Sequence, residues 1–484
     1  MELTIIGMVQ ILIGTYVVLA GSVRGALIFL VISALLDGSA AIALPGLGGS
    51  SIPPVQFALL FTSLRILAPK GGYLRFLPAA VSENKWIVFF VLYGMVCAYL
   101  APRMFGGMVD VFPMRPDPSM GPFDTVPLQP TSQNMTAGFY LLGALLLAIS
   151  SYIFCRLPSG GDALVAALIL ASWLHIGTGV LDLLTRGTSF EVILSLFRNG
   201  GYTPLDLSIS GFIRIRGVLP EASSYAGLGF TLFLAMAELW YRSIRTRATG
   251  LAAAALALML VLSTASTAYV ALGAYALFFT FRAMIFPAAT PPGKLARAVI
   301  AACGILFLLA VLMATIPRLP FAVYELIIDM TVGKPASFSG QQRLFWALQG
   351  WDSFIASYGL GIGPGSFRSS SMVTAILGST GLIGIVTFGI YLKSVFQASK
   401  KSTWGIGPIP YQSIGGALAT AAVVSLVPAA VSSPHAIPAA LFSIMAGAAI
   451  ALRTSLADVA EELKPPFREF RWESRVKTEK VTTS

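Results

Sequence analysis

Residues 297–316 read RAVIAACGILFLLAVLMATI, an apolar run whose one charge stands at its first position. A helix needs about 20 apolar residues to cross a bilayer, so this run predicts a membrane span. The rest of the chain continues the pattern, because 56% of its 484 residues are hydrophobic and 11% are charged. Soluble domains carry about 25% charged residues, so the composition predicts an all-α polytopic membrane protein without a separate soluble domain.

Similar apolar runs recur along the chain and predict about thirteen spans, within an expected range of about 12–14. They cover approximately 3–20, 26–45, 53–68, 86–102, 136–155, 163–184, 223–240, 250–264, 267–283, 297–316, 372–394, 412–430 and 436–452. Residues 1–452 therefore form the transmembrane domain. The remainder, 453–484, mixes Lys, Arg and Glu and is predicted to be a solvated tail.

Lys and Arg gather in four short loops, at 70–85, 242–247, 282–297 and 393–401. All four fall on the same side of the membrane in this set of spans. Cytoplasmic loops carry an excess of Lys and Arg, so this side and the tail are predicted to be cytoplasmic. The same rule accounts for the net charge of +11 without nucleic acid as a partner.

Three longer loops then lie on the outer side, at 105–136, 185–222 and 317–371. The last contains Ser339-Gly-Gln-Gln-Arg343-Leu-Phe-Trp346 and, further on, Gly359-Leu-Gly361-Ile-Gly363-Pro-Gly365-Ser366. Ser339 and Gln342 fit a capping box, so a helix is expected to begin there and to end at Gly359. Arg343 would lie near its first turn, where a cation opposes the helix dipole. Helix stability does not explain it, whereas anion binding does.

The outer loops 185–222 and 317–371 carry arginines. Lys and Arg normally concentrate in cytoplasmic loops, so arginines on the outer side need another explanation. They are Arg186, Arg198, Arg214 and Arg216 in the first loop, and Arg318, Arg343 and Arg368 in the second. A polyanionic ligand such as a lipid pyrophosphate would account for them, since Arg binds phosphate in a bidentate manner. Ion pairing with nearby carboxylates is the alternative. We expect it for Arg186, Arg198 and Arg318, and we favour a functional role for Arg216 and Arg343.

Glu221 is the candidate general base, because it lies at the start of a predicted helix, five residues after Arg216. A plain N-terminal helix charge explains it equally well. Asp37 is interpreted as structural. His175 lies inside a predicted span and fits a hydrogen-bonded core histidine, whereas His435 lies in an outer turn that could reach the site. The two histidines lie far apart in the sequence, and the three cysteines fall in apolar segments, so neither a metal site nor a cofactor is predicted.

Several of these stretches resemble the O-antigen ligase and O-antigen polymerase superfamily, which includes polymerases of exopolysaccharide clusters. Arg216-Gly-Val-Leu-Pro220-Glu221-Ala-Ser223 resembles an Arg-x-x-Gly-like element with a Glu-Pro-Ser-like motif. The segment Leu262-Ser-Thr-Ala-Ser-Thr-Ala-Tyr269 resembles a Ser-rich helix start, although the usual Arg is absent. The Arg343-Leu-Phe-Trp346 segment, the Gly-rich turn after it and Gly381-Leu-Ile-Gly384 resemble the end of the large periplasmic loop and the next helix. The resemblance covers about residues 214–396.

The resemblance implies a GT-C-like fold in a bacterial inner membrane, with the active site facing the periplasm. The implied activity moves a glycan from an undecaprenyl pyrophosphate carrier to an acceptor, without a metal or cofactor. Arg216 and Arg343 would hold the pyrophosphate and Glu221 would be the base. Substrate-binding roles would fall to Arg214, Trp346, Gly363, Gly365 and Arg368. Flippase and chain-length regulator proteins are the implied protein partners.

Ligases of this superfamily carry a histidine just before the helix that follows the large loop, where this chain has Ser369-Ser-Ser371-Met372. We therefore favour a polymerase of repeat units over an O-antigen ligase or a protein O-glycosyltransferase of the same fold. A flippase or other transporter of lipid-linked oligosaccharides is the alternative from another class. It would need charges lining a path through the membrane, whereas the charges here cluster in the outer loops.

Overall fold

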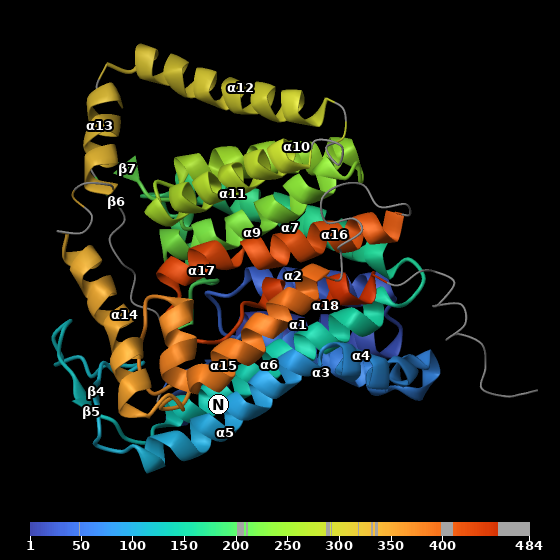
Figure 1. Cartoon of the computed structure of the whole chain (residues 1–484). Coiled ribbons are helices and arrows are strands. Elements are labelled where there is room, and N and C mark those ends of the chain that lie inside the picture. The colour runs from blue at the N-terminus through green and yellow to red at the C-terminus, as the bar shows by residue number, and fades with distance from the viewer. Residues whose placement is uncertain are drawn as a thin grey trace, which may run out of the picture. The chain divides into compact units, whose positions relative to one another are not determined.

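Long helices lying side by side form most of the protein (Figure 1). The computed structural model describes residues 1–47, 49–200, 208–209, 212–286, 291, 293–317, 319–330, 333, 337–397 and 410–453. The described part belongs to one unit, Met1–Arg453. The predicted tail lies almost entirely outside the described residues.

The helices of the first half are α1 (Ile5–Leu19), α2 (Val23–Leu35), α3 (Pro54–Leu67), α4 (Leu77–Glu83), α5 (Lys85–Met104), α6 (Ser132–Cys155), α7 (Gly160–Thr185), α8 (Glu191–Ser195) and α9 (Ala222–Tyr241). Those of the second half are α10 (Thr246–Leu262), α11 (Ser266–Ile285), α12 (Lys294–Thr315), α13 (Leu319–Met330), α14 (Phe338–Ala356), α15 (Met372–Gln397), α16 (Pro410–Val424), α17 (Leu426–Ser432) and α18 (Ala440–Ala451). Short 3-10 helices cover Pro45–Leu47, Pro69–Gly71 and Tyr73–Phe76.

Each predicted span falls on one of these helices, and the chain is an all-α polytopic membrane protein. Within the described residues, 8 helical segments are long and apolar enough to cross a membrane. They are α5, α6, α7, α9, α11, α12, α15 and the joined α16 and α17. The apolar helices α1, α2, α3, α10 and α18 are shorter, with 10–17 residues each. Length and composition thus support fewer spans than the 12–14 that the sequence predicts.

Two predicted spans were too long. The segment 26–45 is helical only to Leu35, after which the chain turns and forms a strand. The segment 436–452 becomes helical only at Ala440. Pro434 and Pro438 precede that helix, and proline cannot donate the backbone hydrogen bond that a helix interior needs.

Small antiparallel sheets stand between the helices. Strands β1 (Glu2–Leu3), β2 (Ile42–Leu44) and β3 (Ser50–Ile52) form one sheet in that order, with Glu2 opposite Ala43 and Ile42 opposite Ile52. Strands β4 (Asp110–Val111) and β5 (Val126–Pro127) pair in the first outer loop, and β6 (Ser208–Ile209) pairs with β7 (Phe212–Ile213) in the second. They organise loops that the sequence alone left without structure.

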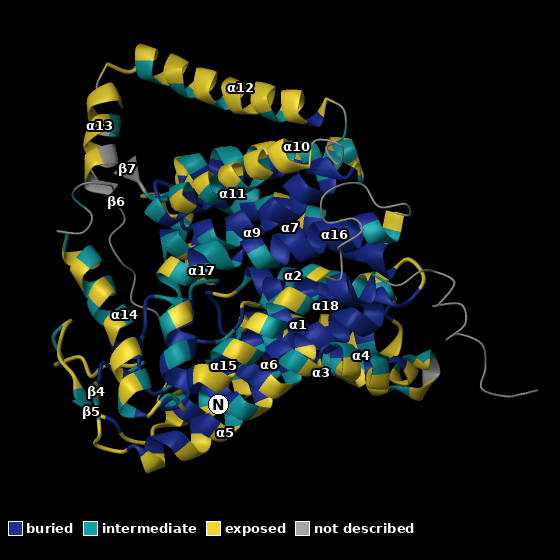
Figure 2. Cartoon of the chain, in the orientation of Figure 1, coloured by how far each residue is buried: buried dark blue, intermediate teal, exposed yellow. Residues whose placement is uncertain are grey.

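The core lies where α6, α7, α9, α16 and α18 meet, and Figure 2 shows these helices largely in the colour of buried residues. Small side chains allow the close approach. A Cβ atom on Gly447 of α18 would lie 2.1 Å from the Ala148 carbonyl oxygen of α6. Membrane helices pack through such small residues because lipid supplies no hydrophobic drive between them. By contrast, α12 buries only its first residue, Lys294, among those described.

The described residues of the predicted cationic loops lie at one end of the helix bundle, which we call the basic end. Arg453 after α18 forms a salt bridge of 2.7 Å with Glu83 of α4, and the Tyr391 hydroxyl near the end of α15 donates to Asn84. We call the opposite end the loop end. Arg242 and Arg282 are corrections to this picture, because both are fully buried beside Glu238 rather than exposed in loops.

Candidate functional site

The helix predicted within the third outer loop exists as α14, but its cap differs from the prediction. Ser337, and not Ser339, is the N-cap, and its hydroxyl accepts a hydrogen bond from the Gly340 N–H. The predicted end is close to the observed one, since α14 stops at Ala356 and Gly359 has a φ of 82°. Arg343 therefore lies in the second turn of α14 rather than in the first, farther from the free N–H groups of the helix start.

Arg343 is half-exposed and makes no ion pair or side-chain hydrogen bond with any residue that the structure describes. Its carbonyl oxygen accepts a hydrogen bond from the Ser370 hydroxyl, which joins α14 to the segment before α15. A guanidinium group has five donors and no acceptor. On the described part of the chain, Arg343 thus offers unused donors and an uncompensated positive charge.

Trp346 lies three residues after Arg343 and so shares its helix face. The Arg368 guanidinium stacks over the Trp346 ring at 4.6 Å, and the Phe112 ring packs on the same indole at 5.5 Å. The backbone N–H of Arg368 also donates to the Phe112 carbonyl oxygen at 2.9 Å. The buried Nε1 of Trp346 has no acceptor among the described residues. We call Arg343, Trp346, Arg368 and Phe112 the Arg–Trp platform.

His435 lies beside this platform. The Ser369 N–H donates to the Pro434 carbonyl oxygen at 3.0 Å, which brings the turn before α18 against the segment that carries Arg368. Burial lowers the pKa of the His435 imidazole, and the nearby Arg368 guanidinium lowers it further. Its Nδ1 makes no hydrogen bond within the described chain. A neutral imidazole can accept a proton, so His435 is a second candidate base.

Gly363 and Gly365 lie in a turn that is wedged between helices. Gly363 has a φ of 95°, and a Cβ atom there would lie 2.6 Å from the Cys97 carbonyl oxygen of α5. At Gly365 the corresponding distance is 2.3 Å, to the Gln133 carbonyl oxygen of α6. Both observations require glycine for packing. They give these residues a structural role without any ligand.

Asp182 of α7 anchors the second outer loop. Its carboxylate forms salt bridges with Arg186 at 2.8 Å and Arg198 at 2.7 Å, and it accepts the Arg216 N–H at 2.9 Å. Arg198 also donates to the Gly217 carbonyl oxygen at 3.0 Å. The ion pairing that we predicted for Arg186 and Arg198 is confirmed, and both arginines share the carboxylate of Asp182.

Arg216 is buried and reaches Glu191 of α8 with a salt bridge of 3.2 Å. Burial lowers the pKa of its guanidinium, and Arg198 acts in the same direction. Arginine remains protonated in proteins, so the surroundings hold three cations against the carboxylates of Asp182 and Glu191. Arg214 lies just before this cluster, and its carbonyl oxygen accepts from Arg186 at 2.9 Å.

Glu221 is the N-cap residue of α9, but its side chain does not cap the helix. The carboxylate instead accepts a hydrogen bond from the Ser223 hydroxyl at 2.9 Å. No contact of Glu221 with the Arg–Trp platform occurs within the described residues. Its position still allows either of the two interpretations from the sequence.

Asp37, which we interpreted as structural, is a further carboxylate near the second group of predicted residues. It follows the end of α2 at the loop end, and its side chain is solvent-accessible. The surrounding protein nevertheless desolvates the carboxylate and raises its pKa. The next residue, Gly38, lies against Val218 and Pro220, directly before Glu221. The sequence feature that could have drawn attention to Asp37 is that it is a lone carboxylate inside an otherwise apolar segment.

The loop end thus gathers two groups of predicted residues. Arg343, Trp346 and Arg368 come together, with Gly363 and Gly365 nearby in the chain, whereas Arg214, Arg216 and Glu221 form the second group. The segment that follows α2 lies against both the second outer loop and α6. Its Ala40 N–H donates to Asn199 at 2.8 Å, and its Ser50 hydroxyl lies 3.1 Å from Thr136 of α6. No direct contact joins Arg216 to Arg343 in the described chain, and Arg318 lies outside it.

No protein-family model matches the sequence, and no curated protein matches it either. The function is therefore inferred from the residues of this chain and their geometry.

Proposed function

We propose that the protein is a membrane polysaccharide polymerase. It would transfer glycan repeat units from undecaprenyl pyrophosphate to a growing lipid-linked chain at the periplasmic face of the inner membrane. The observation that carries the proposal is the half-exposed Arg343 guanidinium, which has no acidic partner in the described residues and shares a helix face with Trp346. Uncompensated cations on the outer side of a membrane protein suit a polyanionic ligand.

The proposed reaction is an inverting displacement. An acceptor hydroxyl oxygen bonds to the anomeric carbon, and the bond from that carbon to the pyrophosphate oxygen breaks. The leaving pyrophosphate takes the electron pair, and the hydroxyl proton passes to a base. Negative charge grows on the leaving group, so Arg343, Arg368 and Arg216 would stabilise the transition state more than the bound substrate. Asp37, Glu221 and His435 are the available proton acceptors.

The Arg–Trp platform also suits a sugar. An aromatic face packs against the apolar face of a sugar ring, while guanidinium groups and the indole N–H donate to hydroxyl or phosphate oxygens. Trp346 provides both features, because its ring is stacked and its Nε1 lacks an acceptor in the described structure.

A second candidate is a ligase, or a protein O-glycosyltransferase, of the same fold. The observation that favours it is the position of His435 beside Arg368 and Ser369. In that function the acceptor would be a lipid A core or a protein side chain, in place of a second lipid-linked glycan.

The test uses the purified full chain in detergent with an undecaprenyl-pyrophosphate-linked repeat unit and excess EDTA. A ladder of lipid-linked products on a gel is the expected result, and it would support a metal-independent polymerase. Transfer only after a lipid A core or protein acceptor is added would support the second candidate. If neither acceptor is glycosylated, the enzymatic proposals are wrong, and a flipping assay in liposomes would test the transporter alternative.

A further inference from the structure

The membrane-spanning helix α5 provides a depth scale for the segments that pack against it. It has 20 residues, or about 30 Å of helix, which matches the thickness of the hydrocarbon core. Tyr93 lies about 16 Å from the loop end of α5, so it marks the middle of the span. Cys97 lies about 10 Å from the same end and therefore in the outer half of the span.

The glycine-rich turn after α14 reaches this depth. The Tyr93 hydroxyl donates to the Leu360 carbonyl oxygen at 3.0 Å, and a Cβ atom on Gly363 would lie 2.6 Å from the Cys97 carbonyl oxygen. Phe367 then packs in one apolar cluster with residues from the outer part of α5. Between Leu360 and Phe367 the chain therefore runs along the outer half of a membrane-spanning helix.

Helix α15 is broken where the turn meets it. Gly381 has a φ of 60° and a ψ of −154°, which are not helical values, and a Cβ atom there would overlap the Gly359 carbonyl oxygen. The Leu382 N–H donates to this carbonyl oxygen at 2.9 Å, and the Ile362 N–H donates to the Gly378 carbonyl oxygen at 2.8 Å. The turn thus supplies, on both sides of the break, hydrogen bonds that a continuous helix makes within itself.

Every backbone N–H group from Gly359 to Gly363 has an acceptor. The acceptors are the carbonyl oxygens of Phe354, Ser357, Gly378 and Ser379 and the hydroxyl of Ser357. A loop in water does not need this complete pairing, because water bonds to the groups that face it. In lipid an unpaired group is costly, so irregular backbone persists there only where the protein pairs it. The turn meets this requirement for a place inside the membrane.

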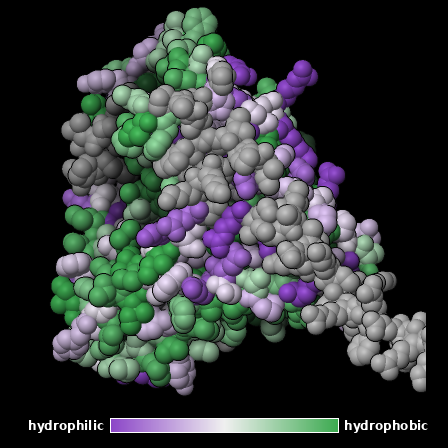
Figure 3. Space-filling model, turned by 45° about the vertical axis from the view of Figure 1, so that its right-hand side comes forward, coloured by the Kyte–Doolittle hydropathy of each residue, from purple (hydrophilic) through white to green (hydrophobic). Residues whose placement is uncertain are grey.

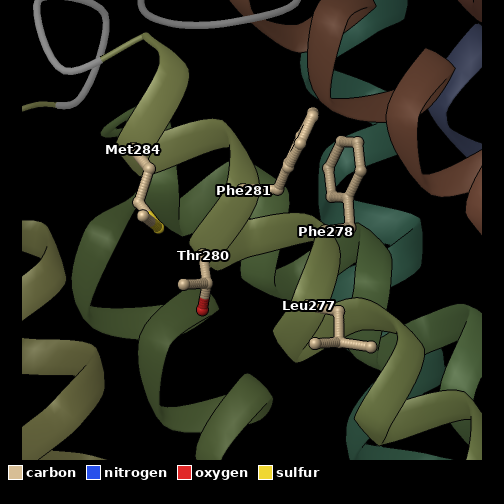
Figure 4. A pocket seen from close by; sticks show the side chains of 5 residues that line it. All are labelled: Leu277, Phe278, Thr280, Phe281 and Met284. Atoms are coloured by element: carbon tan, nitrogen blue, oxygen red, sulfur yellow. The ribbon is translucent and has the colours of Figure 1, made fainter.

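Apolar side chains at the end of α14 and in the turn are exposed as those of a lipid-facing span are. Ile355 is 58%, Tyr358 81% and Leu360 44% exposed. For comparison, the membrane-spanning α11 alone lines a shallow apolar recess (Figure 4), in which Leu277 is 74% and Met284 76% exposed. Figure 3 shows apolar side chains over much of the lower part of the molecule, as expected of a surface in lipid.

We propose that residues 355–367 form a re-entrant element in the outer half of the bilayer, rather than lying outside it as the sequence predicts. Ile355, Tyr358 and Leu360 would contact the acyl chains of the outer leaflet. Asp352, an exposed carboxylate one turn before Ile355, sets the outer limit of this element, because a charge is costly in hydrocarbon. The helix that carries the Arg–Trp platform would thereby be anchored in lipid at its far end, whatever reaction the protein catalyses.

The experiment measures the surroundings of nitroxide spin labels on the full chain in nanodiscs. Labels are attached to Ile355→Cys and Leu360→Cys in a Cys303→Ser background, which removes the exposed native thiol. Oxygen enters hydrocarbon, whereas a polar nickel chelate is excluded from it. The ratio of oxygen to nickel collision rates at both sites should match that at Val96→Cys on the exposed side of α5. It should exceed the ratio at Gln341→Cys, exposed near the start of α14, by about threefold or more.

Equal nickel collision rates at Ile355→Cys, Leu360→Cys and Gln341→Cys would overturn the proposal, because the turn would then lie in water. Low collision rates with both reagents would also overturn it, because protein rather than lipid would then cover these side chains. Leu360→Asp tests the same point without a label. A carboxylate in hydrocarbon is costly, so this variant should lower the Tm in nanodiscs, whereas Gln341→Asp should leave it unchanged. An unchanged Tm of Leu360→Asp would count against a place in lipid.

Discussion

Arg343 and Trp346 share one face of α14, and the guanidinium of Arg368 completes the platform from another segment. Arg343→Ala should reduce polymer formation about a hundredfold or more, the range found when one preorganised donor to a developing oxyanion is removed. Arg343→Lys should retain only part of the activity, because an ammonium group lacks the planar fork. Product ladders from purified variants at equal protein concentration measure both effects.

The matched control for Arg343 is Arg103, an exposed arginine at the loop end of α5 whose side chain donates to the Tyr99 carbonyl oxygen. Arg103→Ala should leave the ladder unchanged. If Arg343→Ala is as active as the wild type, Arg343 does not bind the pyrophosphate. If Arg343→Lys is fully active, Arg343 contributes only its positive charge.

Two carboxylates are candidates for the base of the proposed reaction, and their surroundings differ. Asp37 is accessible and has a raised pKa, whereas Glu221 is bonded to Ser223. A base is most effective when its pKa lies near the working pH, so Asp37→Asn should slow turnover more than Glu221→Gln, by at least tenfold. The rate limited by Asp37 should also rise with pH through that raised pKa. Single-turnover rates across pH 4–8 test this order, and the reverse order would assign the base to Glu221.

Protonation of His435, which lies beside the Arg–Trp platform, should make the stability of the fold depend on pH. Its folded pKa lies below the unfolded value of about 6.5, so the unfolded chain binds protons more readily as pH falls. The corresponding stability is complete above that unfolded value and is lost as pH falls toward the folded pKa. As the pH is lowered from 7.5 to 5, the Tm of His435→Gln should therefore fall less than the Tm of the wild type. Parallel curves would contradict the buried, neutral imidazole.

At the scale of elements, the carboxylate of Asp182 determines the position of the second outer loop. Asp182→Asn removes the charge that Arg186 and Arg198 share and weakens the bond to the Arg216 N–H. Breaking a buried ion pair on one side costs about 3–5 kcal/mol, so the loop should open locally. We expect faster hydrogen exchange across 186–200 and a loss of activity. Asp162→Asn, at the exposed start of the same helix, is the control and should change neither.

Hydropathy was sufficient to place every predicted span on a helix, because lipid requires each spanning segment to satisfy its own backbone. It overestimated the length of α2, because Ile42–Leu44 is apolar but pairs as a strand with Ser50–Ile52. It placed α14 correctly but chose the wrong cap, because Ser337 and Ser339 are equivalent in a local pattern. The salt bridge of Asp182 with Arg198 and the hydrogen bond from the Ser369 N–H to the Pro434 carbonyl oxygen, next to His435, escaped prediction. They join residues distant in sequence, and no local spacing encodes them.

At the scale of the whole molecule, Glu238 joins three helices. The Glu238 carboxylate on α9 accepts from Arg282 of α11 at 2.9 and 3.0 Å and from the Tyr275 hydroxyl at 2.7 Å. It also pairs with Arg242, which reaches Thr420 of α16 at 3.3 Å. All of these groups are buried at the basic end, so the charges can be held there only in the assembled bundle. The packing of α9, α11 and α16 against one another therefore depends on one carboxylate, that of Glu238.

Glu238→Gln removes the buried negative charge that Arg242 and Arg282 share, which should lower the free energy of unfolding by about 3–5 kcal/mol. The surface pair of Glu83 and Arg453 provides the contrast, and Glu83→Gln should cost less than about 1 kcal/mol. Thermal unfolding in detergent, followed by intrinsic fluorescence, measures both variants. Because the cluster lies at the opposite end from the Arg–Trp platform, any Glu238→Gln protein that remains folded should still form the product ladder. A folded, fully stable but inactive Glu238→Gln protein would instead place this carboxylate in the function, and the site at the loop end would then be incomplete.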